Sequence, residues 1–219
     1  MGEPAWFCPF LSHEKKIFFG ILCKKTSKVR KFQLFFRTNC DIIMHRDPKR
    51  KKEKRRRTRI MTVCFTGHRH ISDEIYSKLY DALLSVIEQK IEAGATRFRT
   101  GGALGFDTMA ALAVLSMRLR FPTIKLELML PCPTQTRGWS EDDRMLYEQI
   151  KAQADEVTYI STGYYSGVLQ QRNRCLVEGA DVCVAYLTGS RGGGTAYTAS
   201  LAIKKGLEFI NLFDMIEKQ

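Results

Sequence analysis

Four glycine-bearing turns hold the residues whose types and spacing suggest chemistry. Each follows a short apolar run and precedes a segment with helical spacing. The turns are Thr66-Gly67-His68-Arg69, Gly101-Gly102-Ala103-Leu104-Gly105, Ser161-Thr162-Gly163 and the stretch from Gly189 to Thr195. Glycine lets the backbone N–H groups approach a ligand, and the N-terminus of a following helix favours an anion. This pattern predicts a site for an anionic group, most often a phosphate.

The first turn offers two polar side chains beside Gly67. Arg69 is a candidate for a bidentate pair with a phosphate. His68 is a candidate general acid or hydrogen-bond donor, and the alternative is an ordinary turn residue. No carboxylate or cysteine cluster accompanies this histidine at metal-ligand spacing, so we expect no metal.

The second turn combines glycines with a carboxylate. Gly101 and Gly102 let the chain turn close to a ligand, and Gly105 opens the next helix. Asp107 falls in the first turn of that helix, where the helix dipole favours a negative charge. The alternative is that these glycines serve only a tight turn and close packing, with Asp107 as a cap.

The last two groups of candidates flank the fifth apolar run. Arg172 and Asn173 lie in the first turns of the helix before it and are expected to face the site, although a solvated helix face is the alternative. After the run, three successive glycines lead into a helix with Thr195 at its cap. Gly192, Gly193, Gly194 and Thr195 are the strongest anion-binding signal in the chain.

Strands alternate with helices from Met61 onward, which predicts a parallel sheet with right-handed crossovers. We predict strands over 62–65, 96–100, 125–130, 157–160, 182–187 and 208–213. We predict helices that start at Ser72 or Asp73 and at Ser140, and helices over 106–119, 168–177 and 195–205. The fold class is α/β, a Rossmann-like, doubly wound, mostly parallel sheet with helices on both faces. In such sheets the carboxyl ends of the strands share one edge, so the glycine turns should gather there.

The positive charge of the chain is confined to its first sixty residues. The net charge is +12 over 219 residues, but residues 1–60 hold 18 Lys and Arg against 5 Asp and Glu. Residues 61–219 hold 17 against 18, which is no overall nucleic-acid signature. The seven cysteines are scattered, which predicts a reduced, cytoplasmic setting. The apolar run at 17–22 is too short to span a bilayer, so we expect no membrane association.

Residues 1–60 are predicted to lie outside the fold, as a basic extension that is disordered or not native. The run 49–57 is almost entirely Lys and Arg. It can be encoded by purines alone and precedes Met61 closely, as a translated ribosome-binding site would. We hypothesise that the native bacterial protein starts at Met61 and that 61–219 forms one domain. The alternative is a tail that binds nucleic acid through 49–59 or a membrane surface.

As an ordered set, these motifs resemble the YpsA-like branch of the SLOG superfamily. That superfamily unites the DNA-processing protein DprA/Smf with the lonely-guy phosphoribohydrolases. The resemblance covers nearly all of 61–219 and none of 1–60. The matching segments are Thr66-Gly67-His68-Arg69, Thr100 through Asp107, Pro131-Cys132-Pro133, Trp139 through Arg144, and Gln171-Arg172-Asn173-Arg174.

The resemblance implies a Rossmann-like domain that binds nucleotides or their derivatives. Arg172 matches an arginine of the lonely-guy enzymes, but Thr198 stands where their glycine loop carries a catalytic glutamate. The first turn resembles the Gly-Ser-Arg turn of DprA, although the basic surface that DprA uses for single strands is lacking.

Three functions follow as hypotheses. The first is binding or sensing of a small anionic nucleotide-like ligand, with or without catalysis. The second is an N-glycosidic or phosphoribosyl hydrolase that uses Arg172 and a carboxylate such as Asp107 or Glu141. The third is a nucleic-acid-binding module that relies on 49–59. Ligand identity, the presence of catalysis and a homodimer are left open.

Overall fold

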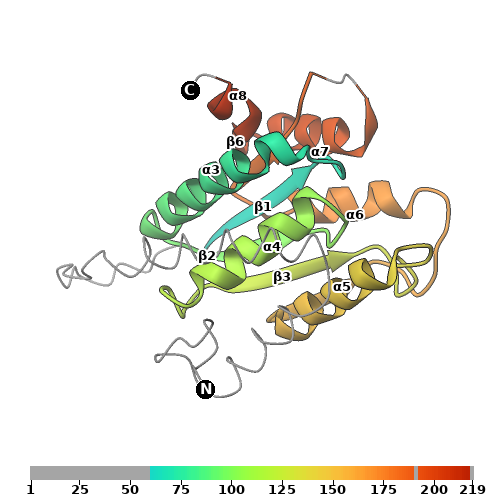
Figure 1. Cartoon of the computed structure of the whole chain (residues 1–219). Coiled ribbons are helices and arrows are strands. Elements are labelled where there is room, and N and C mark those ends of the chain that lie inside the picture. Colours follow the sequence, from blue (N-terminus) through green and yellow to red (C-terminus); the bar gives the residue numbers. More distant parts are fainter. Residues whose placement is uncertain (1–59, 190–191, 218–219) are drawn as a thin grey trace, which may run out of the picture. The chain divides into compact units, whose positions relative to one another are not determined.

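The computed structural model describes residues 60–189 and 192–217. Within them lies one six-stranded sheet of order β4-β3-β2-β1-β5-β6 (Figure 1). Every neighbouring pair of strands is parallel. The strands are β1 (Met61–Gly67), β2 (Ala95–Thr100), β3 (Lys125–Leu130), β4 (Glu156–Tyr159), β5 (Val182–Tyr186) and β6 (Glu208–Asn211).

The helices that connect these strands cover both faces of the sheet, so the predicted doubly wound, Rossmann-like architecture is confirmed. They are α3 (Asp73–Glu92), α4 (Phe106–Met117), α5 (Glu141–Gln153), α6 (Val168–Val177) and α7 (Gly193–Lys204), and a short helix α8 (Leu212–Ile216) follows the last strand. Helices α3 and α4 pack on each other, as do α6 and α7. Right-handed crossovers place α3, α4 and α5 on one face and α6 and α7 on the other.

Strand β1 lies at the centre of the sheet, paired with β2 on one side and β5 on the other. The chain leaves β1 toward α3 and leaves β5 toward α7, which lie on opposite faces. This is the point where the winding of the sheet reverses, and ligands of open α/β sheets bind at the carboxyl edge there. The fold therefore predicts a ligand site at the turns after β1 and β5.

Apolar side chains fill both faces of the sheet. On one face Phe65 and Phe98 stack with ring centroids 6.2 Å apart beneath the α3 and α4 layer. On the other face Cys64 and Cys183, paired across β1 and β5, are enclosed with Leu176 of α6. This packing holds the carboxyl edge of the sheet in place on both sides.

Most predicted element boundaries agree with the structure within two residues. Strand β3 and helix α6 match their predictions, and Ser140 caps α5 by accepting a hydrogen bond from the Asp143 N–H at 3.2 Å. The prediction of a strand over 208–213 is wrong beyond Asn211, because helix α8 begins at Leu212. The Asn211 amide exchanges two 3.0 Å hydrogen bonds with the Leu187 backbone, which fixes the end of β6.

Residues 1–59 lie outside the described residues, and so do the predictions made for them. Within 60–189 and 192–217, no helix is both long and apolar enough to span a membrane.

Candidate functional site

The turns after β1, β2 and β5 meet at the carboxyl edge of the sheet. The Phe106 N–H donates a hydrogen bond to the His68 carbonyl at 3.1 Å, which joins the first turn to the start of α4. The Thr188 N–H donates to His68 Nε2 at 3.1 Å, which joins the first turn to the turn after β5. His68 thus bridges the two strands at which the winding reverses.

The glycines of the first two turns are packed against neighbouring groups. A Cβ atom on Gly67 would collide with the Phe106 ring, and one on Gly105 would collide with the Arg69 backbone. Gly105 also has a φ of +78°, which favours glycine. Gly102, at φ +62°, leaves room for Leu130. These three positions therefore have a structural reason to be glycine, which is the close-packing alternative stated above.

Gly101 makes room for an ion pair. A Cβ atom there would overlap the Arg172 guanidinium and would lie 2.8 Å from Asp107 Oδ2. Arg172 Nη1 donates to Asp107 Oδ2 at 3.2 Å, and the two side chains are only 9% and 7% exposed. The Ala103 N–H donates to the same oxygen, also at 3.2 Å. The second turn and α6, predicted separately, are thus joined through buried charges.

Burial dominates the electrostatics of Asp107. It raises the pKa of this carboxyl above its ordinary value, because desolvation penalises the charged form. The Arg172 charge, the Ala103 N–H and the more distant Arg69 charge each oppose that rise. Arg69 of the first turn and Arg172 of α6 therefore both act on one carboxylate, although the Arg69 side chain itself is exposed.

Arg172 keeps one donor without a partner. Its Nε is enclosed, yet it makes no hydrogen bond within the described residues. A charged group this buried ordinarily has its donors satisfied, since an unmade hydrogen bond costs about 1–3 kcal/mol. The Nε of Arg172 is therefore an unsatisfied donor within the described residues.

The N-terminus of α7 lies next to this arginine. Asn173, the residue after Arg172, is buried and donates through Nδ2 to the Gly194 carbonyl at 3.3 Å. Gly192 is the N-cap of α7, and no described side chain caps that end. Cβ atoms on Gly192 and Gly193 would meet no described atom within 4 Å, and Gly194 has only Asn173, at 3.6 Å. Unlike the earlier glycines, these three border open space.

The prediction that Thr195 caps the last helix is wrong. Helix α7 begins at Gly193, so Thr195 is its third residue. Within that helix, Thr198 is buried and its hydroxyl donates to the Gly194 carbonyl at 2.8 Å. A neutral hydroxyl thus tightens the first turn of α7.

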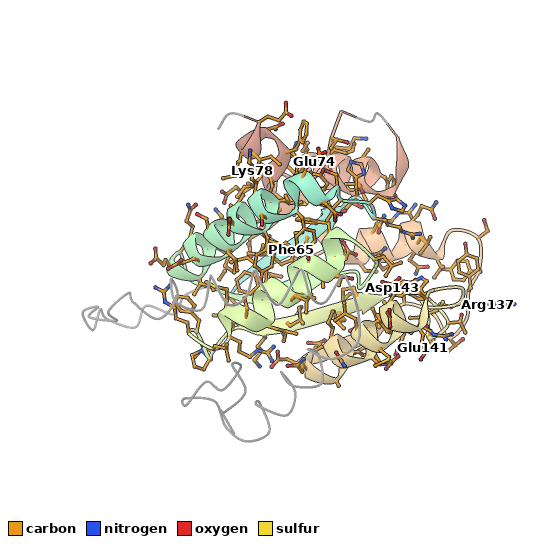
Figure 2. The ribbon with its side chains drawn as sticks, viewed as in Figure 1. Phe65, Glu74, Lys78, Arg137, Glu141 and Asp143 are labelled. Carbon is orange, nitrogen blue, oxygen red and sulfur yellow. The ribbon has the colours of Figure 1, made fainter. Side chains whose placement is uncertain are left out.

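The turn after β4 does not join the other three directly. Its Ser161 N–H donates to the Pro131 carbonyl at 3.0 Å, beside the end of β3. Glu141 is also separate from the arginine site. It lies with Asp143 at the start of α5 (Figure 2), is 70% exposed on its side chain and pairs with Arg144. Of the two carboxylates considered for a hydrolase, Asp107 alone pairs with Arg172.

Two contacts in this region were not predicted from the sequence. Gln135 donates through Nε2 to the Gly102 carbonyl at 2.6 Å, and the Thr188 hydroxyl lies 3.1 Å from His68 Nε2. Both residues lie in turns that the sequence had marked, one after Pro131-Cys132-Pro133 and one at the start of the last glycine turn. Neither residue belongs to a sequence pattern that would have marked it as a site residue.

Among the described residues, no three His, Cys, Asp or Glu side chains gather as metal ligands.

Comparison with known proteins gives relatives in bacilli and a solved structure of the same fold. The UPF0398 protein of Bacillus thuringiensis (strain Al Hakam) is 31% identical over 140 residues, which cover 59% of this chain and 76% of that protein. The UPF0398 protein of Bacillus anthracis (strain A0248) is 30% identical over the same length, with the same coverage of both chains. The crystal structure of DNA processing protein A (DprA) from Streptococcus pneumoniae matches with a TM-score of 0.52 at 17% identity. That match covers 73% of this chain but only 56% of DprA, and it shows a shared fold.

The family model of the YspA SLOG family matches residues 63–215. The match begins in β1 and ends in α8, so it includes every turn described above. The resemblance drawn from the ordered motifs is thereby confirmed, and the chain belongs to the YspA SLOG family.

Proposed function

We propose that this protein binds a nucleotide or a nucleotide-derived phosphate ligand at the carboxyl edge of β1, β2 and β5. The observation that carries the proposal is the buried Arg172 guanidinium, whose Nε has no partner among the described residues. A phosphate oxygen is the acceptor that best suits such a donor, because guanidinium and phosphate geometries match.

The start of α7 supports the same ligand. The first N–H groups of a helix have no partner within it, and the helix dipole adds a partial positive charge at that end. Here Gly192, Gly193 and Gly194 are exposed, so no side chain of their own obstructs an approaching anion. Asn173 ties this end to the helix that carries Arg172. A phosphate held between them would satisfy both sets of donors.

The charge balance favours a small ligand over a long polyanion. Residues 61–219 carry 17 basic and 18 acidic residues, so positive charge is local to the site. Membership of the YspA SLOG family and the DprA-like fold fit a function connected with nucleotides or nucleic acids. Binding of nucleic acid through 49–59 remains the alternative, and it predicts an affinity that falls steeply with salt.

Hydrolysis of a nucleotide is a second candidate, supported by one observation. Asp107 is a buried carboxyl with a raised pKa, in contact with the arginine that matches the lonely-guy arginine. A carboxylate near the ribose would stabilise positive charge that develops there. The test is release of free base from nucleoside monophosphates. Loss of that release in Arg172→Lys supports hydrolysis, and absence of release in the unmodified protein rules it out for those substrates.

Ligand binding is tested by thermal unfolding of the full chain with AMP, NAD, ADP-ribose and cyclic AMP. A ligand at a hundredfold its Kd adds about 2.7 kcal/mol of stability. For a domain of this size, that raises Tm by roughly 5–10 °C. The variant Arg172→Lys should lose most of the shift, because lysine cannot reproduce the guanidinium geometry. Arg144→Lys, an exposed position on α5 that pairs with Glu141 away from the arginine site, is the matched control and should keep it. A panel that shifts nothing contradicts the proposal.

A further inference from the structure

A cluster of aromatic and guanidinium groups lies beside the start of α7, and the binding proposal does not use it. We call Tyr165, Arg174 and Tyr197 the aromatic rim. Arg174 Nε donates to the Tyr197 hydroxyl at 2.9 Å, which joins α6 to α7. The Tyr165 hydroxyl bonds to Gln171, which lies one helical turn before Arg174 on α6. Tyr197 first, and then Tyr165, raise the pKa of the Arg174 guanidinium. Arg174 is exposed, Tyr165 is 43% exposed and Tyr197 is half-buried, so the rim faces solvent.

Tyr165 is held at both ends although it is exposed. Its hydroxyl bonds to the Gln171 side chain, and its carbonyl accepts the Val168 N–H at 3.2 Å. These contacts fix the ring against the start of α6 and leave its surface partly open. The neighbouring Tyr164 is 69% exposed and has no such contact with the described residues. An exposed ring that is already ordered loses little conformational entropy when a flat partner stacks on it.

The rim lies one helical turn from the proposed phosphate position. Asn173 contacts Gly194, and the next residue, Arg174, contacts Tyr197. From Gly194 to Tyr197 is three residues, or about 4.5 Å along the axis of α7. Helical side chains lean toward the N-terminus, so Tyr197 leans toward the end where the phosphate would bind. A group joined to that phosphate through one sugar ring is within reach of the rim.

We propose that the aromatic rim binds the nucleobase of a mononucleotide whose phosphate lies at the start of α7. The inference rests on the proposed function and adds that the site recognises the base of the ligand as well as its phosphate. Aromatic rings and guanidinium planes stack on the faces of all bases, so the rim gives affinity for a base with little choice among bases. The rim therefore separates nucleotides from sugar phosphates and from inorganic phosphate.

The test compares AMP with ribose 5-phosphate, which differ by the base. Equilibrium dialysis on the full chain gives a Kd for each. We expect AMP to bind about 5- to 150-fold more tightly, the range for one stacked base. Tyr165→Leu should bring the two values together without changing that of ribose 5-phosphate. Tyr165→Phe should keep most of the difference, because the ring remains, and Tyr164→Leu is the matched control that keeps all of it.

Failure of this inference is distinguishable from failure of the proposed function. If AMP and ribose 5-phosphate bind equally to the unmodified protein, the rim does not bind the base, although the phosphate site stands. Equal effects of Tyr164→Leu and Tyr165→Leu also overturn the inference. If neither compound binds, the mononucleotide inference is overturned, and the thermal unfolding panel decides the proposed function separately. Tyr165-dependent binding of a single-stranded oligonucleotide, with no binding of AMP, overturns the mononucleotide assignment.

Discussion

Replacing Gly101 with alanine tests whether this position is glycine because Arg172 needs the space. The φ of Gly101 is not positive, so an alanine can adopt the same backbone conformation. The added Cβ atom would overlap the Arg172 guanidinium, and it would lie 2.8 Å from Asp107 Oδ2. The arginine must withdraw, which leaves Asp107 buried without its partner.

The expected loss of stability follows from breaking a buried ion pair. Removing one partner of such a pair costs about 3–5 kcal/mol, because a buried charge is left uncompensated. For a domain of this size each kcal/mol lowers Tm by roughly 2–4 °C, so Gly101→Ala should lower Tm by roughly 6–20 °C. Protonation of Asp107 would relieve part of this cost, since burial already raises its pKa. The loss should therefore be smaller at pH 4–5 than at pH 7.

Urea unfolding followed by circular dichroism measures this cost, and Gly163→Ala is the matched control. Gly163 also follows a strand at the carboxyl edge. Its φ is not positive, and a Cβ atom there would meet no described atom within 4 Å. The control should change stability by no more than about 1 kcal/mol. In an Arg172→Ala background, Gly101→Ala should lose most of its effect, because the group it displaces is gone.

Two results would refute this reasoning. A cost of Gly101→Ala that matches that of Gly163→Ala would show that Arg172 moves aside freely. A cost that persists unchanged in the Arg172→Ala background would show that the alanine acts through some other neighbour. In either case the ion pair would not be the reason for glycine at this position.

Three further predictions concern stability. Because burial raises the pKa of Asp107, the folded chain keeps its proton to a higher pH than the unfolded chain. The stability of the unmodified protein relative to Asp107→Asn should thus be greatest below the unfolded pKa of about 3.9, and should fall as pH rises from there through the folded pKa. Urea titrations at several pH values would show this, and a rising difference would contradict it. The Tyr147 hydroxyl is enclosed without a partner among the described residues, so Tyr147→Phe should stabilise by up to about 1 kcal/mol in thermal unfolding, and a loss of that size would point to an unseen partner. Ser140→Ala removes the α5 cap and should cost about 1 kcal/mol, whereas no change would show that α5 does not need it.

The order of strands and helices could be predicted from the sequence, because the spacing of apolar residues indicates each element and turn residues separate one element from the next. The run 168–177 has helical spacing and 125–130 is uniformly apolar on one face, and both elements were found at those bounds. The end of β6 could not be predicted, because a short apolar run such as 208–213 suits a strand and a helix equally. The contact that decides it is the Asn211 amide on Leu187, which is 24 residues away in sequence.

The sequence marked the three turns that meet at the carboxyl edge, but it could not distinguish two uses of glycine within them. Gly67 lies close to the Phe106 ring and Gly105 lies close to the Arg69 backbone, whereas Gly192 and Gly193 border open space. All four have the same local signature, a glycine between a strand and a helix. What separates them is the identity of the nearest atoms, which come from distant parts of the chain. The pairing of Asp107 with Arg172 was equally hidden, because 65 residues separate the two.

The buried pair itself argues for a ligand. Taking two charges out of water is costly, and a well-packed apolar pair of similar volume is often as stable or more so. Stability alone is therefore a poor reason for Arg172 and Asp107 to be enclosed at 9% and 7% exposure, with Arg172 Nε still lacking a partner among the described residues. Asp107 offsets the arginine charge enough to allow burial, and an incoming phosphate would complete the unused donor once the groups that enclose it move aside. The proposed ligand accounts for both the enclosure of the pair and the donor that the protein leaves unsatisfied.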